Sequence, residues 1–246
     1  MMRPKPRSTM SGTTCLVTLN IEFRLVSITA SQSSRVIFRN MRSLVMPALL
    51  TSTSIGPCSA LALAKASTVE AFSKAVAEHG PIDVLVNNAG ITRDRMFLKM
   101  TPEDWKAVID TNLNSMFNVT KQVVPGMVEK GWGRIIQISS VNGEKGQAGQ
   151  TNYSAAKAGM HGFTMALAQE VASKGVTVNT VSPGYIGTDM VRAIRPEILE
   201  KIVSTIPVKR LGTPEEIGSI VAWLASDDSG FTTGADFSCN GGLHMG

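Results

Sequence analysis

Beyond about residue 65, short apolar runs alternate with longer segments in which apolar residues recur at helical spacing. Apolar runs of five or six residues bounded by turn-forming residues predict short buried strands. These runs are residues 82–86, 134–139, 176–181 and 235–239. Helices are predicted at residues 69–78, 101–117, 152–173 and 214–225. This alternation predicts an α/β fold, namely a Rossmann-like doubly wound parallel sheet in a single domain.

Two of the predicted helices carry a start signal, and one carries an interruption. Thr101 and Thr213 are each followed by proline and then by two acidic residues, which is typical of a helix N-cap. Asn112 lies in the middle of the predicted helix 101–117, and asparagine is a poor helix former. It predicts a kink that presents a carbonyl or water to a site, the alternative being an asparagine on the helix surface.

The first 64 residues do not share this pattern. They contain 17 Ser and Thr residues but only two glycines, Gly12 and Gly56, and their apolar runs keep neither a strand nor a helix period. Prolines and a Ser/Thr run interrupt the apolar stretch 45–64, so no membrane span is expected there. The chain therefore divides into an atypical segment, residues 1–64, and a regular body, residues 65–246.

The charge follows the same division. The chain has a net charge of +5, but residues 1–64 contain seven basic residues and one acid, whereas residues 65–246 contain 17 basic and 18 acidic residues. A nearly neutral body argues against nucleic acid as a partner. Three widely spaced cysteines without a CxxC pair argue against a disulfide framework and favour a reducing, cytoplasmic compartment. The three histidines lack the spacing of metal ligands, so no metal site is expected.

The most specific chemistry lies around Tyr153 and Lys157. Four residues apart on a predicted helix, the two side chains share one face, and the ammonium is expected to lower the pKa of the phenol toward neutrality. A phenol of that kind serves as a general acid or base. Ser140 follows the predicted strand 134–139, where its hydroxyl could bind a substrate carbonyl, and Ser139 competes with it for this role. The alternatives are a solvated Tyr–Lys pair and an ordinary Ser–Ser turn.

Two further motifs follow predicted strands. The sequence Asn87-Asn88-Ala89-Gly90 follows the strand 82–86, and small or amide residues there let a ligand approach the backbone. The sequence Ser182-Pro183-Gly184-Tyr185 follows the strand 176–181 and could support a planar ligand. Each is also compatible with a simple turn.

Taken together, these motifs resemble the short-chain dehydrogenase/reductase family over about residues 65–246. Within the family, residues 146–153, 206–212 and 240–246 resemble the acetoacetyl-CoA reductases of polyhydroxyalkanoate synthesis. The resemblance implies NADPH-dependent reduction of acetoacetyl-CoA to 3-hydroxybutyryl-CoA in polyhydroxybutyrate synthesis. The related 3-oxoacyl-acyl-carrier-protein reductases, and a catalytically dead homologue, are the alternatives.

The resemblance also assigns roles to residues. Tyr153 would donate the proton, Ser140 would hold the carbonyl oxygen, Lys157 would bind the nicotinamide ribose, and the backbone of Asn112 would hold a relay water. The cofactor would further be lined by Asn88, Ala89, Gly90, Ile91, Thr92, Pro183, Gly184, Tyr185 and Ile186. The CoA substrate would contact Asp94, Gln147, Gln150, Tyr185 and Arg195. The family is usually tetrameric, and close helix packing would be permitted by Ala155, Ala156, Ala158, Gly159 and Gly162.

The sequence departs from the family in residues 1–64. The family begins with a strand, a glycine-rich loop and a helix that together bind the cofactor pyrophosphate. Here no such loop is present, although the segment has about the length that those elements require. We hypothesise that residues 1–64 are read in a shifted frame that is restored near Lys65. A divergent N-terminal half is the rival explanation, and weak or absent cofactor binding is expected in either case.

Overall fold

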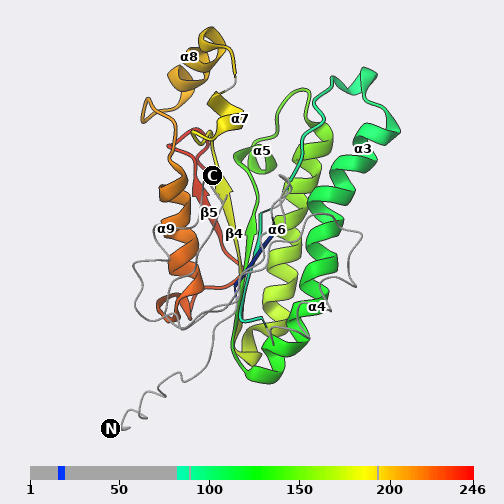
Figure 1. Cartoon of the computed structure of the whole chain (residues 1–246), viewed down its shortest axis with the longest axis vertical. Helices are drawn as coiled ribbons and strands as arrows, with labels where there is room; N and C mark the ends of the chain where they lie inside the picture. Colours follow the sequence, from blue (N-terminus) through cyan, green and yellow to red (C-terminus); the bar gives the residue numbers. More distant parts are fainter. Residues whose placement is uncertain (1–15, 20–81, 89, 193) are drawn as a thin grey trace, which may run out of the picture.

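The computed structural model describes residues 16–19, 82–88, 90–192 and 194–246. In these residues five parallel strands form one sheet and are hydrogen-bonded to one another in chain order (Figure 1). The strands are β1 (Leu16–Leu19), β2 (Val84–Asn87), β3 (Gly133–Ile138), β4 (Val176–Pro183) and β5 (Asp236–Cys239). The prediction of a Rossmann-like α/β fold with a parallel sheet is confirmed. The predicted helix 69–78, and all of residues 1–64 except β1, lie outside the described residues.

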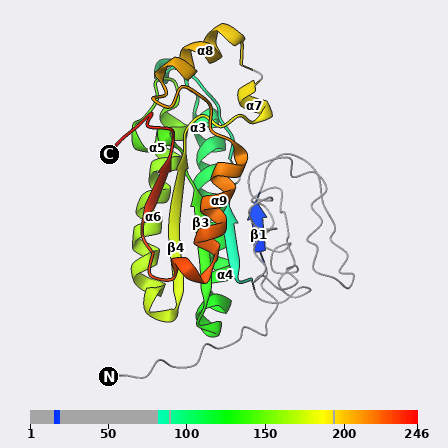
Figure 2. The ribbon, with the colours of Figure 1, turned by 90° about the vertical axis from the view of Figure 1, so that its left-hand side faces the viewer.

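Helices connect β2 to β3, β3 to β4 and β4 to β5, and they cover both faces of the sheet (Figures 1 and 2). The longer ones are α3 (Pro102–Ile109), α4 (Ser115–Lys130), α6 (Thr151–Val171), α8 (Pro196–Thr205) and α9 (Pro214–Ala225). Shorter helical turns are η1 (Phe97–Lys99), η2 (Asp110–Asn114), α5 (Val141–Glu144), η3 (Ala172–Lys174), α7 (Asp189–Arg192) and η4 (Asp227–Ser229). Within the described ranges, no helix is both long and apolar enough to cross a membrane.

The core consists of two apolar layers, one on each face of the sheet. On one face, Leu85 and Ile135 pack against Met127 of α4 and against α6. On the other face, Ile136 packs against Val221 of α9. Because side chains alternate along a strand, the consecutive residues Ile135 and Ile136 serve opposite layers. This explains why these strands are apolar throughout: the sheet is buried on both sides.

The structure confirms both predicted helix starts and shows an interruption in the first of these helices. The hydroxyl of Thr101 accepts a hydrogen bond from the backbone N–H of Asp104, and Thr213 does the same with Glu216, each as part of a capping box. The predicted helix 101–117 is divided by the π-helical turn η2, which contains Asn112, the residue at which a kink is expected. The sequence reading did not identify α5, α7 and α8. The first two have four residues each, and α8 buries none of its side chains, although its apolar residues Ile198, Leu199, Ile202 and Val203 recur at helical spacing.

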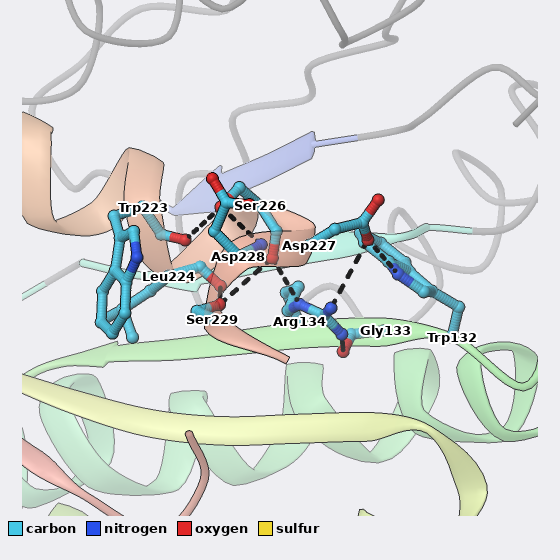
Figure 3. A network of polar contacts seen from close by, with 9 residues as sticks. All are labelled: Trp132, Gly133, Arg134, Trp223, Leu224, Ser226, Asp227, Asp228 and Ser229. Carbon is cyan, nitrogen blue, oxygen red and sulfur yellow. Dashed lines mark hydrogen bonds and ion pairs between the residues drawn. The ribbon is translucent and has the colours of Figure 1, made fainter. Parts of the chain in front are cut away.

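A polar network joins α9 to β3 at the edge of the sheet opposite the motifs that follow the strands (Figure 3). The guanidinium of Arg134 is buried, stacks on Trp132 at 4.4 Å from the ring centroid, and donates to the carbonyl of Ser226 at 3.1 Å. Asp227 pairs with Arg134 at 3.7 Å and accepts from the indole N–H of Trp132 at 2.9 Å. The hydroxyl of Ser229 closes the turn by donating to the carbonyl of Leu224 at 2.9 Å. Buried charge is tolerated here because each donor has a partner.

Candidate active site

The motifs that follow β2, β3 and β4 meet at one edge of the sheet. All strands are parallel, so their carboxyl ends lie on the same side, where α5, α7 and α8 stand above them (Figure 1). Ligands of open α/β sheets bind in the crevice at this edge. The N-terminal half of α6 passes beside it, and contributes Tyr153 and Lys157.

Lys157 lies deep in this site, with only 3% of the residue exposed. Its ammonium donates to the backbone carbonyl of Ile138, the last residue of β3, at 2.7 Å. Its Nζ lies 5.6 Å from the centroid of the Tyr153 ring. Burial disfavours the charged form and lowers the pKa of Lys157 to about 8. The helix therefore presents a partly desolvated amine next to a phenol, as the four-residue spacing predicts.

The expected lowering of the pKa of Tyr153 by Lys157 is not found. Burial raises the pKa of Tyr153 above its ordinary value of 10.0, and the charge of Asp94 adds to the rise. A hydrogen bond with the Ser140 side chain acts in the opposite direction. The physical reason is that Lys157 directs its ammonium to a carbonyl and stands over the phenol ring, so desolvation dominates. Tyr153 consequently holds its proton firmly at neutral pH.

Ser139 and Ser140 point to different surroundings, as expected for consecutive extended residues. Ser140 is half-buried, lies within hydrogen-bonding reach of the Tyr153 side chain, and caps α5 by accepting from the N–H of Asn142 at 3.2 Å. Ser139 is buried and faces α6, where its hydroxyl donates to the carbonyl of Lys157 at 2.9 Å. Of the two competing hydroxyls, only that of Ser140 therefore adjoins the phenol.

Asn112 connects the π-helical turn η2 to the loop after β2. Its side chain is fully buried, accepts from the N–H of Ile91 at 2.8 Å and donates to the carbonyl of Ile91 at 2.9 Å. A π-helical turn in an α-helix is frequently found at a functional site. The predicted kink is present, and the alternative of a surface asparagine is wrong.

The loop after β2 passes closely over Lys157. A Cβ added to Gly90 would lie 3.3 Å from Oδ1 of Asn112 and 3.6 Å from Nζ of Lys157. The absence of a side chain at Gly90 therefore lets the backbone of this loop pass close to a buried amide and a buried amine. Asn88, Ile91 and Thr92 lie on the same loop, while Ala89 is outside the described residues. No group of three or more metal-ligating side chains is found in the described part of the chain.

The segment after β4 packs against the end of β5 and the C-terminal residues. The N–H of Gly184 donates to the carbonyl of Cys239 at 3.0 Å, and a Cβ at Gly184 would approach the Cα of Asn240 to 2.8 Å. The side chain of Asn240 in turn accepts from the N–H of Gly242 and donates to the carbonyl of His244, both at 2.9 Å. The contacts of Gly184 with Cys239 and Asn240 thus fix the position of the segment that contains Pro183, Tyr185 and Ile186.

Three of the five expected substrate residues lie near one another. The side-chain amide of Gln150 donates to Asp94 at 2.9 Å and accepts from Asn142 at 2.9 Å. Gln147 belongs to the adjoining turn, in which its carbonyl accepts from the N–H of Gln150 at 3.0 Å. Tyr185 follows β4, and Arg195 is the exposed N-cap residue of α8. These last two share the same edge of the sheet, and no described hydrogen bond or ion pair joins their side chains to the other three.

Sequence reasoning missed three polar residues that adjoin the site. Asn142 bridges Ser140 and Gln150, whereas His161 and Asp236 lie behind Lys157. His161 could have been found because it follows Lys157 by four residues on the same helix. Asn142 and Asp236 carry no signal in the sequence, since their partners come from separate elements.

This edge of a parallel sheet, with a Ser–Tyr–Lys constellation and an asparagine in a helix break, defines an oxidoreductase site, and comparison with known sequences agrees. A sequence profile described as "Enoyl-(Acyl carrier protein) reductase" matches residues 57–244. The chain belongs to the short-chain dehydrogenase/reductase family, whose reductases use a nicotinamide cofactor.

Individual relatives are more specific. The chain is 75% identical over 180 residues to an acetoacetyl-CoA reductase of Cupriavidus necator, which is 73% of each chain. It is 63% identical over 166 residues to an acetoacetyl-CoA reductase of Allochromatium vinosum, which is 68% of each chain. It is 49% identical over 187 residues to a 3-oxoacyl-(acyl-carrier-protein) reductase of Vibrio cholerae, covering 76% of this chain and 77% of the relative. The chain is thus an oxidoreductase homologous to acetoacetyl-CoA reductases.

Proposed function

We propose that the protein reduces acetoacetyl-CoA to 3-hydroxybutyryl-CoA with NADPH. The observation that supports this most directly is the placement of the Ser140 and Tyr153 side chains together above the buried ammonium of Lys157. The substrate is suggested by the relatives that are named acetoacetyl-CoA reductases, at 59–75% identity for four of them. The product would feed polyhydroxybutyrate synthesis.

The chemistry follows from the protonation states of the site. Bound NADPH supplies the hydride that reaches C3 of the thioester. Ser140 holds the carbonyl oxygen by donating its hydroxyl hydrogen, and Tyr153 transfers its proton to the same oxygen as negative charge develops there. At neutral pH the phenol is fully protonated and can therefore act as the proton donor.

The remaining residues would bind the reactants and restore the proton. Lys157, still charged below about pH 8, holds the nicotinamide ribose and returns a proton to Tyr153. Asn112, through its backbone carbonyl, holds the water that relays protons to Lys157. The cofactor is lined by residues 88–92 and 183–186. Asp94, Gln147, Gln150, Tyr185 and Arg195 contact the CoA thioester.

The direct test is NADPH oxidation in the presence of acetoacetyl-CoA. Tyr153→Phe should lower kcat by about a thousandfold or more, and Ser140→Ala by about a hundredfold, since proton transfer and oxyanion stabilisation each contribute at this scale. Ser173→Ala, at an exposed serine in η3, is the matched control and should retain full activity. No turnover by the unsubstituted chain would contradict the proposal.

Acyl-carrier-protein thioesters are the nearest alternative substrates. The 3-oxoacyl-(acyl-carrier-protein) reductase of Vibrio cholerae is less similar, at 49% identity, than the acetoacetyl-CoA reductase of Cupriavidus necator at 75%. We therefore expect a higher kcat/KM with acetoacetyl-CoA than with acetoacetyl-acyl-carrier protein. A reversed preference would favour the alternative.

A second candidate is a catalytically inactive homologue. Residues 1–64 lack the glycine-rich loop that would bind the cofactor pyrophosphate, and the matching sequence profile begins only at residue 57. The Cupriavidus necator relative is matched over 73% of its length and 73% of this chain, so the two chains have nearly the same length. A nearly equal length without the family's glycine-rich loop supports a shifted reading frame in residues 1–64. Of these residues, the structure describes only 16–19.

Two measurements separate the candidates. Calorimetric titration with NADPH should show weak or absent binding if the loop is missing, and micromolar affinity would overturn this expectation. Sequencing the coding region should reveal a single-nucleotide shift that recovers the glycine-rich loop. If no such shift exists, the frame hypothesis fails and a divergent N-terminal half remains.

We also propose that the protein is a cytoplasmic homotetramer. The outer face of α4 and α6 exposes large apolar side chains, with Phe117 at 51% and Met165 at 52%. Ala155 and Ala158 are exposed on α6, and a Cβ at Gly162 would meet nothing within 4 Å, so a partner helix could approach. Ala156 and Gly159 instead face inward, the first buried and the second against Leu113. Light scattering of the purified chain would test the tetramer.

A further inference from the structure

A cluster of polar side chains lies between α6, the helix that carries Tyr153 and Lys157, and the sheet. His161 is one helical turn after Lys157 on α6, and its Nε2 is 2.9 Å from the hydroxyl of Ser139. Its Nδ1 is 3.5 Å from a carboxylate oxygen of Asp236, the first residue of β5. Asp236 is fixed in turn by the hydroxyl of Ser182 in β4, which lies 2.9 and 3.0 Å from its two oxygens. The cluster thus combines one helix, two strands and the residue that directly follows β3.

The hydrogen bonds determine where the protons are. Ser139 has one hydroxyl hydrogen, and it donates this hydrogen to the carbonyl of Lys157 at 2.9 Å. The contact between Ser139 and His161 is therefore favourable only if Nε2 of His161 carries a proton and donates it. His161 accordingly acts as a donor toward Ser139.

The other side of the imidazole requires a second proton. Nδ1 of His161 faces Asp236, and a bare nitrogen lone pair would repel a carboxylate. One proton therefore lies between them, on His161 as an imidazolium or on Asp236 as a carboxylic acid. Burial raises the pKa of Asp236; Ser182 and His161 oppose this rise, and Glu144 of α5 adds to it. Both arrangements hold the imidazole in one orientation.

A hydroxyl, an imidazole and a carboxylate in this order also form the nucleophilic triad of many hydrolases. Here Ser139 is only 4% exposed, and its hydroxyl hydrogen is already donated to a backbone carbonyl. A substrate cannot reach this oxygen, and the base does not receive its proton. The cluster is therefore not a second catalytic centre.

Its structural consequence concerns Lys157. The end of β3 holds this residue at two points, because Ile138 accepts from the ammonium at 2.7 Å and Ser139 donates to the carbonyl at 2.9 Å. The next residue of the strand is Ser140, and Tyr153 lies one turn earlier on α6. A contact that fixes Ser139 against α6 therefore also fixes the separation between Ser140 and Tyr153.

We propose that His161, held by Asp236, is a positioning residue of the reductase. Its Nε2 proton fixes the hydroxyl of Ser139, and this hydroxyl holds the backbone of Lys157 against the end of β3. The inference rests on the proposed function, since it assigns His161 a role in that reaction. A displacement of about 1 Å at reacting groups can cost about a hundredfold in rate, so such a contact affects turnover without touching the substrate.

Two substitutions of His161 separate positioning from simple packing. His161→Leu removes both contacts, whereas His161→Gln places an amide donor near the position of Nε2 and keeps the bond to Ser139. We expect His161→Leu to lower kcat for acetoacetyl-CoA by about 10- to 100-fold, with KM changed by no more than about twofold. His161→Gln should recover kcat to within about threefold of the unsubstituted chain, and Ser139→Ala should resemble His161→Leu. The control Gln169→Leu, at an exposed position of the same helix, should change neither constant.

The kinetic outcome that overturns the proposal is an equal loss in His161→Gln and His161→Leu, or a change in KM alone. A second readout does not depend on activity. In nitrogen-15 spectra of labelled histidine, Nε2 of His161 should be protonated and its hydrogen should exchange slowly, and Ser139→Ala should accelerate that exchange. An unprotonated Nε2 refutes the contact whatever the activity. A chain with the expected spectrum but no turnover in any variant refutes the proposed function and, with it, the role of His161 in turnover, but leaves the contact itself established.

Discussion

The side-chain amide of Asn112 hydrogen-bonds both backbone polar groups of Ile91, accepting from its N–H at 2.8 Å and donating to its carbonyl at 2.9 Å. The bond joins the π-helical turn between α3 and α4 to the loop that carries Gly90. Asn112 is fully buried and Ile91 is partly buried, so removing the side chain deprives two backbone groups of their protein partner. Asn112 thus has a structural task in addition to its proposed place in the proton relay.

Asn112→Ala should destabilise the fold by about 1–3 kcal/mol, because it removes both hydrogen bonds of the partly buried backbone groups of Ile91 and leaves a cavity at a buried position. Asn112→Asp should also destabilise the fold. A carboxylate can accept from the N–H of Ile91, but its second oxygen would face and repel the carbonyl oxygen of Ile91. Denaturant unfolding measures both effects. Asn114→Ala is the control, because Asn114 is exposed in the same turn and bonds only Asp110, so its loss should change stability little.

Lys157 should make stability depend on pH in the alkaline range. Its pKa is lowered by burial from 10.5 to about 8, so between these values the folded chain has lost the proton that the unfolded chain still binds. The free energy of unfolding should therefore rise from about pH 8 to about pH 10.5, by roughly 1 kcal/mol per pH unit. Below about pH 8 this residue contributes no slope.

Lys157→Met tests this expectation. The substitution should abolish the proposed activity and remove the alkaline rise, and it should increase stability at pH 7 because a desolvated ammonium is replaced by an apolar chain. Urea unfolding at several pH values between 7 and 10 measures the slope in both proteins. An unchanged slope in Lys157→Met would assign the dependence to another group.

Arg134 lies far from the candidate active site, and its replacement should strongly reduce the stability of the fold. Arg134→Met removes the donor to the carbonyl of Ser226 and the stacking on Trp132, and should cost about 2–4 kcal/mol. Arg210→Met is the control, because Arg210 pairs with Glu216 at the surface, where such pairs contribute little. Thermal unfolding should show a clear decrease for the first variant and almost none for the second.

Two glycines distinguish the site from the surface. Gly90→Ala introduces a methyl group 3.3 Å from Asn112 and 3.6 Å from the ammonium of Lys157, so the KM for NADPH should rise about tenfold or more, as the loss of close approach implies. Gly162→Ala meets nothing within 4 Å in its own chain and is the control, which should leave the KM for NADPH unchanged. A normal KM in Gly90→Ala would exclude the loop after β2 from the cofactor site.

The sequence predicted the strands and the capped helices because their signals are local. The apolar run 134–139 predicts a strand, and the pair Thr213-Pro214 predicts the start of a helix, without reference to other parts of the chain. The four-residue spacing likewise places Tyr153 and Lys157 on one face of a helix. The predicted direction of the pKa shift of Tyr153 was wrong. The burial of the phenol and the hydrogen-bond partner of the Lys157 ammonium both depend on how separate elements pack. Asn142, His161 and Asp236 were missed for the same reason, since each acquires its partners only when separate strands and helices meet.

The packing of Gly184 against Asn240 has a practical consequence for handling the protein. Asn240 organises the last residues of the chain through Gly242 and His244, and the same residue abuts the segment proposed to line the cofactor. An affinity tag fused after Gly246 would therefore start two residues from a turn that supports the active site. Cofactor affinities measured on such a fusion would report on the tag as well as on the enzyme, so the tag should be removable or separated by a long flexible spacer.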